Sequence, residues 1–229
     1  MARRPRGTEA RRGELLEAAG RLFVREGFAS VSVSRIVREV GVAQGTFYYY
    51  FESKEAVLDA LLAAHVQEAA ARLAAVARQA GLDPRGALEA MIRTELSFDE
   101  RRARELGSIR GADAHTKLFA ATMRALAPIY GAVIARGVAA GGFRTDHPDL
   151  LGETIVLHAH SLFDRDMLGW SEAEYARRRR ILAGLVAFLL GLSAGALDFG
   201  VHPKTGVLTA ATRSGTRSRG GRGSGSGSR

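Results

Sequence analysis

The sequence lacks cysteine, has few lysines, and contains no segment in which apolar and polar residues alternate as they do in strands. The absence of cysteine excludes disulfide frameworks and thiolate metal sites, and it fits a reducing compartment. No apolar stretch follows the N-terminal arginines, so we expect no secretory signal and a cytoplasmic location. The 229 residues suffice for one large domain or two modest ones. The absence of alternating segments favours an all-α protein.

The net charge of +9 is concentrated at the two ends of the chain. Residues 1–12 carry a net charge of +4 and residues 201–229 one of +6, so the remainder sums to −1. Basic ends often grip phosphate or a minor groove, although basic tails also serve solubility alone. We expect residues 1–7 to form a flexible basic arm that contacts DNA. Residues 200–229 are rich in Gly, Ser and Arg and are predicted to be disordered.

Apolar residues recur at helical spacing through most of the remaining chain. This spacing and the capping residues predict helices over about 8–26, 33–40, 44–50, 54–79, 84–98, 113–140, 148–168 and 171–197. Residues 99–105 are expected to form a short exposed helix or loop. Pro128 is expected to kink or split its helix, because proline removes a backbone donor. The short helices of residues 8–53 would then precede a longer helical domain over 54–199.

Residues 27–54, GFASVSVSRIVREVGVAQGTFYYYFESK, carry the most informative pattern. Gly41 can adopt the left-handed backbone of a tight turn between two short helices. Two helices joined by three or four residues form a helix-turn-helix, whose second helix enters the DNA major groove. Four consecutive aromatic residues span about 300° of a helix, so they cannot all face the core. We expect Phe47 and Phe51 to be buried, and the tyrosines between them to face outward.

The exposed polar and aromatic side chains of this region are the candidate DNA contacts. A glutamine amide at the start of a recognition helix can pair with adenine, hydroxyls can donate to phosphate, and a glycine lets backbones approach closely. The predicted contacts are Ser32, Ser34, Arg35, Gln44, Gly45, Thr46, Tyr48, Tyr49 and Lys54. Residues 13–55 have five basic and six acidic side chains. Binding would therefore depend on placed contacts and on the arm.

Residues 14–62 resemble the N-terminal domain of the TetR family of bacterial transcriptional regulators. The resemblance rests on ELLEAAGRLFVREGF, VSRIVREVGV, AQGTFYYYF and SKEAVLDALL, in that order. It implies a three-helix DNA-binding domain, a helical ligand-binding domain and a homodimer. It also implies a repressor that leaves operator DNA when a small molecule binds. Ala43 and Val37 depart from the family's pattern, the first where a polar cap is common and the second where alanine is usual.

The segment 181–197, ILAGLVAFLLGLSAGAL, is apolar all round. Its length reaches the lower limit for a membrane span, and Gly191-x-x-x-Gly195 resembles a close-packing motif. Such a helix can equally be buried in a dimer. The resemblance implies dimerisation through the last two long helices, over about 148–168 and 171–197, and we favour this interpretation. The alternative is a helical small-molecule-binding or membrane-associated protein with a vestigial helix-turn-helix.

No pattern typical of catalysis or metal binding is present. The chain has no phosphate-binding glycine loop, no nucleophile elbow and no His or carboxylate cluster at ligand spacing, so we expect neither an enzyme nor a metal or other cofactor. A mainly apolar effector pocket is expected in the middle of the chain. Its candidate lining residues, each of which taken alone is more typical of plain core, are Met91, Phe98, Phe119, Met123, Tyr130, His158 and Phe163.

Overall fold

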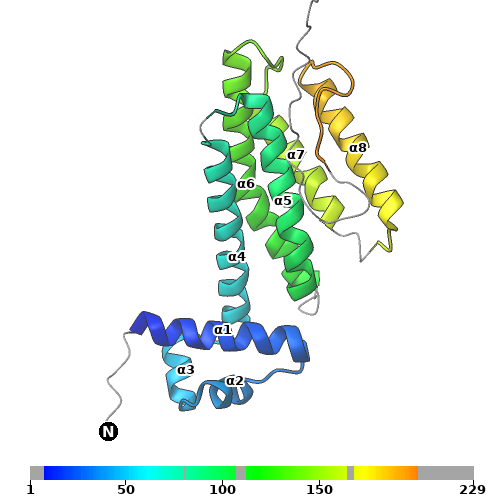
Figure 1. The fold of residues 1–229 in the computed structure, drawn as a ribbon. Coiled ribbons are helices and arrows are strands. Elements are labelled where there is room, and N and C mark those ends of the chain that lie inside the picture. The colour runs from blue at the N-terminus through cyan, green and yellow to red at the C-terminus, as the bar shows by residue number, and fades with distance from the viewer. Residues whose placement is uncertain (1–7, 80, 107–111, 164–167, 201–229) are drawn as a thin grey trace, which may run out of the picture.

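The chain is all-helical over the residues that the structure describes. The computed structural model describes residues 8–79, 81–106, 112–163 and 168–200, without the side chains of 96–106, 112–115, 161 and 163. Within these ranges it contains α1 (Thr8–Glu26), α2 (Val33–Val40), α3 (Gln44–Tyr50), α4 (Lys54–Ala77), α5 (Pro84–Leu106), α6 (Ala112–Ala139), α7 (Pro148–Phe163) and α8 (Glu172–Leu189). The first three helices form a group at one end of α4, and α5 to α8 form a bundle around its other end (Figure 1).

Local signals start and end the N-terminal helices at the predicted residues. Ser32 caps α2, because its Oγ accepts a hydrogen bond from a backbone N–H of the first turn at 3.2 Å. Gly41 ends α2 with φ +75°, and the Val42 N–H bonds back to the Val37 carbonyl at 3.0 Å. Ala43 begins α3 without a side-chain cap, as predicted. Ser53 in turn caps α4, accepting from a backbone N–H at 3.1 Å.

A first hydrophobic core joins α1, α2 and α3 to the beginning of α4. Phe47 is fully buried and Phe51 is 4% exposed, which confirms the prediction that these two rings anchor α3. The buried members of this core are Leu15, Ala19, Leu22, Phe23, Val31, Ile36, Val37, Phe47, Phe51, Val57, Leu58 and Leu62. The last three belong to α4. A shift of α4 would therefore carry α3 with it.

A second hydrophobic core is built from the far half of α4 and from α5 to α8, and it includes Leu73 and Ala77 of α4. Within it, α6 and α7 cross where both helices have glycine. A Cβ atom on Gly152 would lie 2.6 Å from the Ala127 carbonyl oxygen and 2.7 Å from the Gly131 nitrogen. The two backbones can approach this closely because neither glycine carries a side chain. One helix, α4, thus connects both cores.

Two helices in the middle of the chain are more continuous than predicted. Residues 99–105 are not a separate element but continue α5 to Leu106. Their Glu, Arg and Ala residues favour helix, and no glycine or proline interrupts them. Pro128 does not split α6, which runs through it. Packing of α6 against α4 and α7 stabilises a helix that loses one backbone hydrogen bond at this proline.

The last helix, α8, ends at Leu189 and not at Leu197 as predicted. Gly191 adopts φ +67°, and the Leu192 N–H bonds back to the Ala187 carbonyl at 2.8 Å, which is a Schellman end. Gly195, with φ +77°, turns the chain again. The close-packing interpretation of Gly191 and Gly195 is therefore wrong. The segment after α8 doubles back beside it (Figure 1).

Candidate DNA-binding surface and ligand cavity

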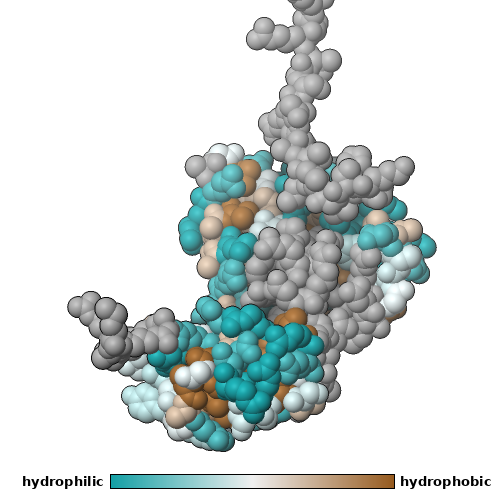
Figure 2. Space-filling view, turned by 60° about the horizontal axis from the view of Figure 1, so that its bottom comes forward, coloured by the Kyte–Doolittle hydropathy of each residue, from teal (hydrophilic) through white to brown (hydrophobic). Residues whose placement is uncertain are grey.

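The exposed face of α3 carries most of the predicted base-reading side chains. Gln44 and Gly45 are exposed at the start of the helix. Tyr48 is 52% exposed and Tyr49 is 74% exposed, while Phe47 beneath them is fully buried. This end of the molecule, which comes forward in Figure 2, mixes hydrophilic and hydrophobic residues on one surface. Gln44 and Tyr48 are four residues apart and share one face of α3, and the Tyr48 ring packs edge-on against the buried Phe47 ring.

Gly45 has no intramolecular reason to be glycine. A Cβ atom at this position would meet nothing within 4 Å, and the residue does not need a positive φ. Glycine inside a helix is less favourable than alanine by about 1 kcal/mol, so stability does not require glycine here, and the missing side chain leaves room for another backbone to approach. Thr46, the next predicted contact, is half-buried.

The N-terminus of α2 carries the two predicted serine contacts. Ser32 and Ser34 are both exposed. The Ser32 hydroxyl already accepts the capping hydrogen bond, and its own O–H can still donate to phosphate. Ser34 lies within the first turn, where backbone N–H groups and the helix dipole also favour an anion.

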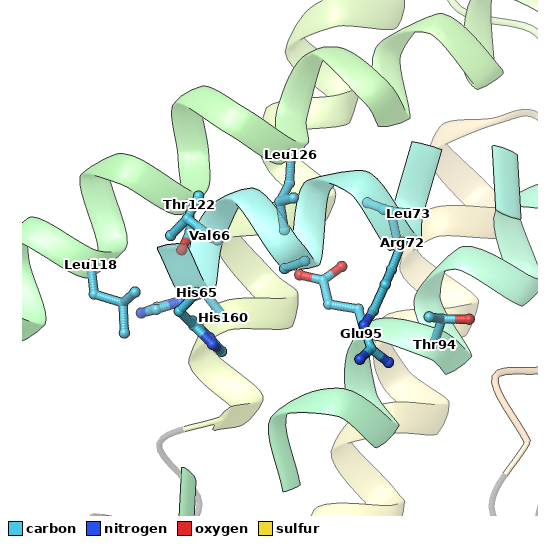
Figure 3. Close-up of a pocket in the computed structure, with 11 residues that line it drawn as sticks. His65, Val66, Arg72, Leu73, Thr94, Glu95, Leu118, Thr122, Leu126 and His160 are labelled. Atoms are coloured by element: carbon cyan, nitrogen blue, oxygen red, sulfur yellow. The ribbon is translucent and has the colours of Figure 1, made fainter. Parts of the chain in front are cut away.

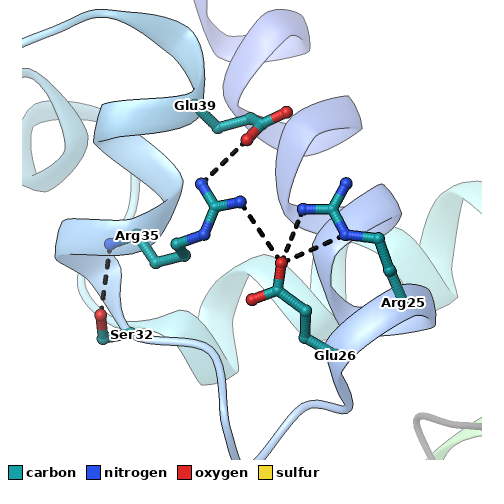
Figure 4. A network of polar contacts seen from close by, with 5 residues as sticks. All are labelled: Arg25, Glu26, Ser32, Arg35 and Glu39. Atoms are coloured by element: carbon teal, nitrogen blue, oxygen red, sulfur yellow. Dashed lines mark hydrogen bonds and ion pairs between the residues drawn. The ribbon is translucent and has the colours of Figure 1, made fainter.

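The guanidinium of Arg35 is held within the protein and is not simply exposed (Figure 4). It donates to Glu39 Oε2 at 2.9 Å and to Glu26 Oε1 at 3.3 Å. Arg25 donates to the same Glu26 oxygen at 2.6 and 3.2 Å. The hydrogen bond from Arg25, followed by the charges of Arg35 and Arg25, lowers the pKa of Glu26. Arg35 thus joins the end of α1 to α2.

Lys54 also contacts its own protein at the place where DNA contact was predicted. Its Nζ lies 3.0 Å from the Phe28 carbonyl oxygen, 3.4 Å from that of Ala29 and 3.2 Å from that of Val31. It also stands 4.5 Å from the centre of the Phe28 ring. An ammonium group has three N–H donors, and these carbonyls can take all three.

The predicted arm, residues 1–7, lies outside the described residues, as does most of the predicted tail, 200–229. Near the start of α1, the guanidinium carbon of Arg12 lies 4.9 Å from the centre of the Phe51 ring. A basic side chain therefore packs against the first hydrophobic core close to the N-terminus of α1.

A cavity lies between α4, α5, α6 and α7, where the effector pocket was expected (Figure 3). It measures about 40 Å³, which is room for a few water molecules. Its lining residues are His65, Val66, Ala69, Arg72, Leu73, Thr94, Glu95, Leu118, Thr122, Leu126 and His160. In the view of Figure 3, the two histidines lie toward one end and Glu95 and Arg72 toward the other.

None of the predicted pocket residues whose side chains the structure describes lines this cavity. Met91 and Tyr130 are fully buried in the second core, and the half-buried Met123 lines a separate groove between α6 and α7. His158 does not face inward: it is exposed, with Nδ1 2.8 Å from the Thr154 carbonyl oxygen. The half-buried Phe119 ring lies 5.0 Å from the ring of the cavity residue His160. The side chains of the two remaining candidates, Phe98 and Phe163, lie outside the described residues.

The most polar feature of the cavity is a buried acid that the sequence prediction missed. Glu95 is 8% exposed, and its Oε2 accepts a hydrogen bond from the Tyr130 hydroxyl at 2.5 Å. Burial, and then the Glu95 carboxylate, raise the pKa of Tyr130 well above 10. Glu95 follows Leu88 by seven residues, on the apolar stripe of α5. A charged residue among the apolar residues of this stripe is the sequence signal that could have indicated a buried acid.

Metal binding and a membrane span are two other functions on which the described residues bear. No group of three or more His, Asp or Glu side chains there is placed to hold a metal ion. By length and composition alone, one helical segment of this part of the chain, Thr116–Ala139, could cross a membrane, and 33% of its most apolar window is buried. The segment proposed from sequence as an alternative membrane span, 181–197, is not one continuous helix, because α8 ends at Leu189.

The described residues form a three-helix N-terminal unit with α3 exposed, and a helical bundle with an internal cavity. The N-terminal unit has the arrangement of a helix-turn-helix DNA-binding fold. Residues 15–61 match the family model described as bacterial regulatory proteins, tetR family. The repressor KstR2 of Rhodococcus jostii is 33% identical over 88 residues, which are 38% of this chain and 43% of KstR2. The regulator EthR of Mycolicibacterium smegmatis is 42% identical over 59 residues, 26% of this chain and 27% of EthR. The matches thus span less than half the length of these curated relatives.

Solved structures extend the likeness of fold beyond the N-terminal domain. SmeT, the repressor of the Stenotrophomonas maltophilia multidrug efflux pump SmeDEF, has a TM-score of 0.64 at 20% identity, covering 85% of this chain and 96% of SmeT. RolR in complex with resorcinol has a TM-score of 0.57 at 22% identity, covering 82% of this chain and 90% of RolR. The N-terminal domain thus matches the tetR family of bacterial regulatory proteins over residues 15–61, and beyond it the likeness is one of fold.

Proposed function

We propose that the protein is a cytoplasmic transcriptional regulator that binds operator DNA as a homodimer and represses until a small molecule releases it. The observation that carries this proposal is the exposed face of α3, where Gln44, Tyr48 and Tyr49 stand over the buried Phe47. A glutamine amide can pair with adenine, and phenols can reach phosphate or a thymine methyl. The relatives that match the N-terminal domain are named as transcriptional repressors and regulators.

Dimerisation is supported by large apolar side chains left exposed on the last two helices. They are Leu150 and Leu157 on α7, 52% and 47% exposed, and Ile181 and Phe188 on α8, 59% and 78% exposed. Each pair is seven residues apart, so each forms a stripe along one face of its helix. Such a face fits a second copy of the chain. A dimer would present two copies of α3 to half-sites about 34 Å apart, or a multiple of that spacing.

Release by an effector is supported by the place and the size of the cavity. Five of its lining residues, including His65 and Leu73, lie on α4. The beginning of α4 belongs to the first hydrophobic core, which also holds α3. A ligand pocket for a drug-sized molecule usually has about 300 Å³ or more, so an effector would have to separate these helices. Moving α4 would change the spacing of the two reader helices. The effector would then lower operator affinity by its preference for the separated state.

Fluorescence anisotropy with a duplex from upstream of the protein's own gene tests the proposal. The wild type should bind this duplex more tightly than random sequence, and Gln44→Ala or Tyr48→Ala should remove most of that preference. Arg38→Ala, on the exposed surface of α2, is the matched control. A wild type without sequence preference would favour the alternative of a ligand-binding or membrane-associated protein with a vestigial reader.

The arm is tested by its salt dependence. Removing residues 2–7 deletes Arg3, Arg4 and Arg6. Because each neutralised phosphate adds about 0.9 to the slope of log affinity against log salt, the truncated protein should lose up to about three units of slope. An unchanged slope would remove the arm from the binding site.

A further inference from the structure

The ion-pair network at the junction of α1 and α2 neutralises the charge of two arginines next to the proposed DNA surface. Arg35 lies in the first turn of α2, one residue after Ser34. Its guanidinium lies between Glu39 of its own helix, 2.9 Å away, and Glu26 at the end of α1, 3.3 Å away. Arg25 contacts Glu26 at 2.6 Å. Two positive and two negative side chains therefore form a locally neutral group (Figure 4).

A guanidinium without these partners would be a strong and unselective ligand for DNA. It presents five donors in a planar fork that matches phosphate, and every DNA sequence offers phosphate. An unrestrained Arg35 beside the two serines of α2 would raise the affinity for target and non-target DNA alike. This added affinity is independent of sequence, because only the contacts of α3 distinguish one site from another.

The two carboxylates of the network have different roles. Glu39 lies four residues after Arg35 on the same helix, so it moves with Arg35. Glu26 belongs to α1 and ties Arg35 to a separate element, while it also engages Arg25. All four side chains of the network remain 30% or more exposed, and ion pairs this exposed contribute little to folding stability. Fold stability alone is therefore a weak explanation for the arrangement.

We propose that Glu26 is a positioning residue, which holds the Arg35 guanidinium in place and thereby limits the sequence-independent affinity of the protein for DNA. The inference rests on the proposed DNA-binding function and adds a residue that need not touch DNA. Glu26 acts by position: it keeps a phosphate-binding group occupied, so that discrimination is left to α3.

The variant Glu26→Gln removes the charge that holds Arg35 and keeps the size of the side chain. Its affinity for a random-sequence duplex should rise, and the slope of log affinity against log salt should steepen by about 0.9 for one new phosphate contact. That slope widens the affinity ratio between 50 and 200 mM salt by about threefold. The preference for the upstream duplex over random sequence should stay close to that of the wild type, because the new contact is to phosphate.

Two matched variants separate release of Arg35 from a general change of charge. Glu17→Gln makes the same change of net charge on α1, at an exposed residue 3.9 Å from Arg21, and should leave random-sequence binding close to wild type. The double variant Glu26→Gln with Arg35→Gln should lose the gain seen in Glu26→Gln. Glu26→Asp, which keeps the carboxylate, should behave nearly as the wild type.

The outcomes distinguish this inference from the proposed function. Equal gains in Glu26→Gln and Glu17→Gln would overturn the role of Glu26, and so would a gain that persists in the double variant. A wild type with sequence preference, whose random-sequence affinity and salt slope Glu26→Gln leaves unchanged, would overturn this inference alone. A wild type with no sequence preference would overturn the proposed function, while the random-sequence measurement would still decide whether Glu26 restrains Arg35.

Discussion

The ammonium nitrogen of Lys54 lies 3.0 Å from the carbonyl oxygen of Phe28, so the first residue of α4 is bound to the end of the turn that follows α1. The same ammonium contacts the carbonyls of Ala29 and Val31 at 3.4 and 3.2 Å. The residues that carry these carbonyls precede α2 and do not belong to a helix. Lys54 therefore closes the three-helix unit on α4, which gives it a structural role whether or not it also contacts phosphate.

The variant Lys54→Met should lower the free energy of unfolding by about 1–3 kcal/mol, because it leaves carbonyls without a charged donor. Urea denaturation followed by circular dichroism measures the change. Lys117→Met is the control: Lys117 pairs with Asp59 at 2.7 Å on the exposed surface, and its loss should change stability by about 1 kcal/mol or less. Equal losses in the two variants would mean that the Lys54 contacts add nothing beyond an exposed ion pair.

Gly45 offers a test in which stability and DNA binding should move in opposite directions. Since a Cβ atom there would meet nothing within 4 Å, Gly45→Ala should raise the free energy of unfolding by up to about 1 kcal/mol. The same methyl group would stand between α3 and an approaching DNA backbone, so affinity for the upstream duplex should fall about tenfold, or about 1.4 kcal/mol.

The control for Gly45→Ala is Gly13→Ala. Gly13 lies in α1, and a Cβ atom there also meets nothing within 4 Å. It should give a similar gain in stability with DNA affinity unchanged. If Gly45→Ala binds as tightly as the wild type, then close backbone approach at this residue is not part of recognition.

The N-terminal unit could be predicted from sequence because its boundaries depend on local chemistry. Ser32 and Ser53 cap their helices with their own hydroxyls, and Gly41 ends α2 through its own backbone. The partners of Lys54 and Arg35 could not be predicted in this way. They depend on where the end of α1 meets α2 and α4, which is a matter of tertiary packing.

The sequence predicted an effector pocket in the middle of the chain, but the cavity there is lined by residues other than the candidates whose side chains are described. Large apolar residues such as Met91 were natural candidates, yet which side of a helix faces a cavity depends on its rotation in the bundle. Glu95 and His65 lie on otherwise apolar stripes of α5 and α4, and this anomaly was visible in the sequence. The end of α8 was missed for another reason: an apolar run with two glycines fits a helix interface as well as a helix stop.

The crossing of α6 and α7 should not tolerate a side chain at Gly152. The added Cβ atom would meet the Ala127 carbonyl and the Gly131 nitrogen at 2.6 and 2.7 Å, and both are backbone atoms that cannot rotate away. Gly152→Ala should therefore lower the free energy of unfolding by about 1–3 kcal/mol, despite the better helix propensity of alanine. Urea denaturation beside Gly13→Ala checks this, since the two identical substitutions should have opposite signs. A gain in both would contradict the close crossing.

The exposed stripe on α8 predicts a dimer that a charge should break. Phe188 is 78% exposed, with Ile181 one heptad earlier. Phe188→Glu would place a carboxylate in the proposed interface, where burying an unpaired charge is strongly unfavourable. Light scattering should report a dimer for the wild type and a monomer for the variant. Arg85→Glu, at an exposed position near the start of α5, is the control for charge. A wild-type monomer, or an unchanged dimer in Phe188→Glu, would refute this interface.

The buried Tyr130 predicts how stability depends on pH at the alkaline end. Burial and the Glu95 carboxylate raise the pKa of Tyr130 well above 10, whereas a tyrosine in the unfolded chain loses its proton near pH 10. The folded state thus keeps a proton that the unfolded state releases. This contribution to stability is complete below about pH 10, and above it the free energy of unfolding falls by about 1.4 kcal/mol for each pH unit.

Tyr130→Phe isolates that contribution. At neutral pH it should lower the free energy of unfolding by about 1–3 kcal/mol, because the Glu95 carboxylate loses the 2.5 Å hydrogen bond. Above pH 10 its free energy of unfolding should fall less steeply with pH than that of the wild type. The two slopes should differ by about 1.4 kcal/mol per pH unit, which corresponds to one proton. Urea denaturation from pH 8 to 11 measures both effects. Tyr49→Phe, which removes a hydroxyl from a side chain that is 74% exposed, is the matched control. Equal slopes in the wild type and Tyr130→Phe would show that Tyr130 ionises in the folded protein as readily as in the unfolded chain.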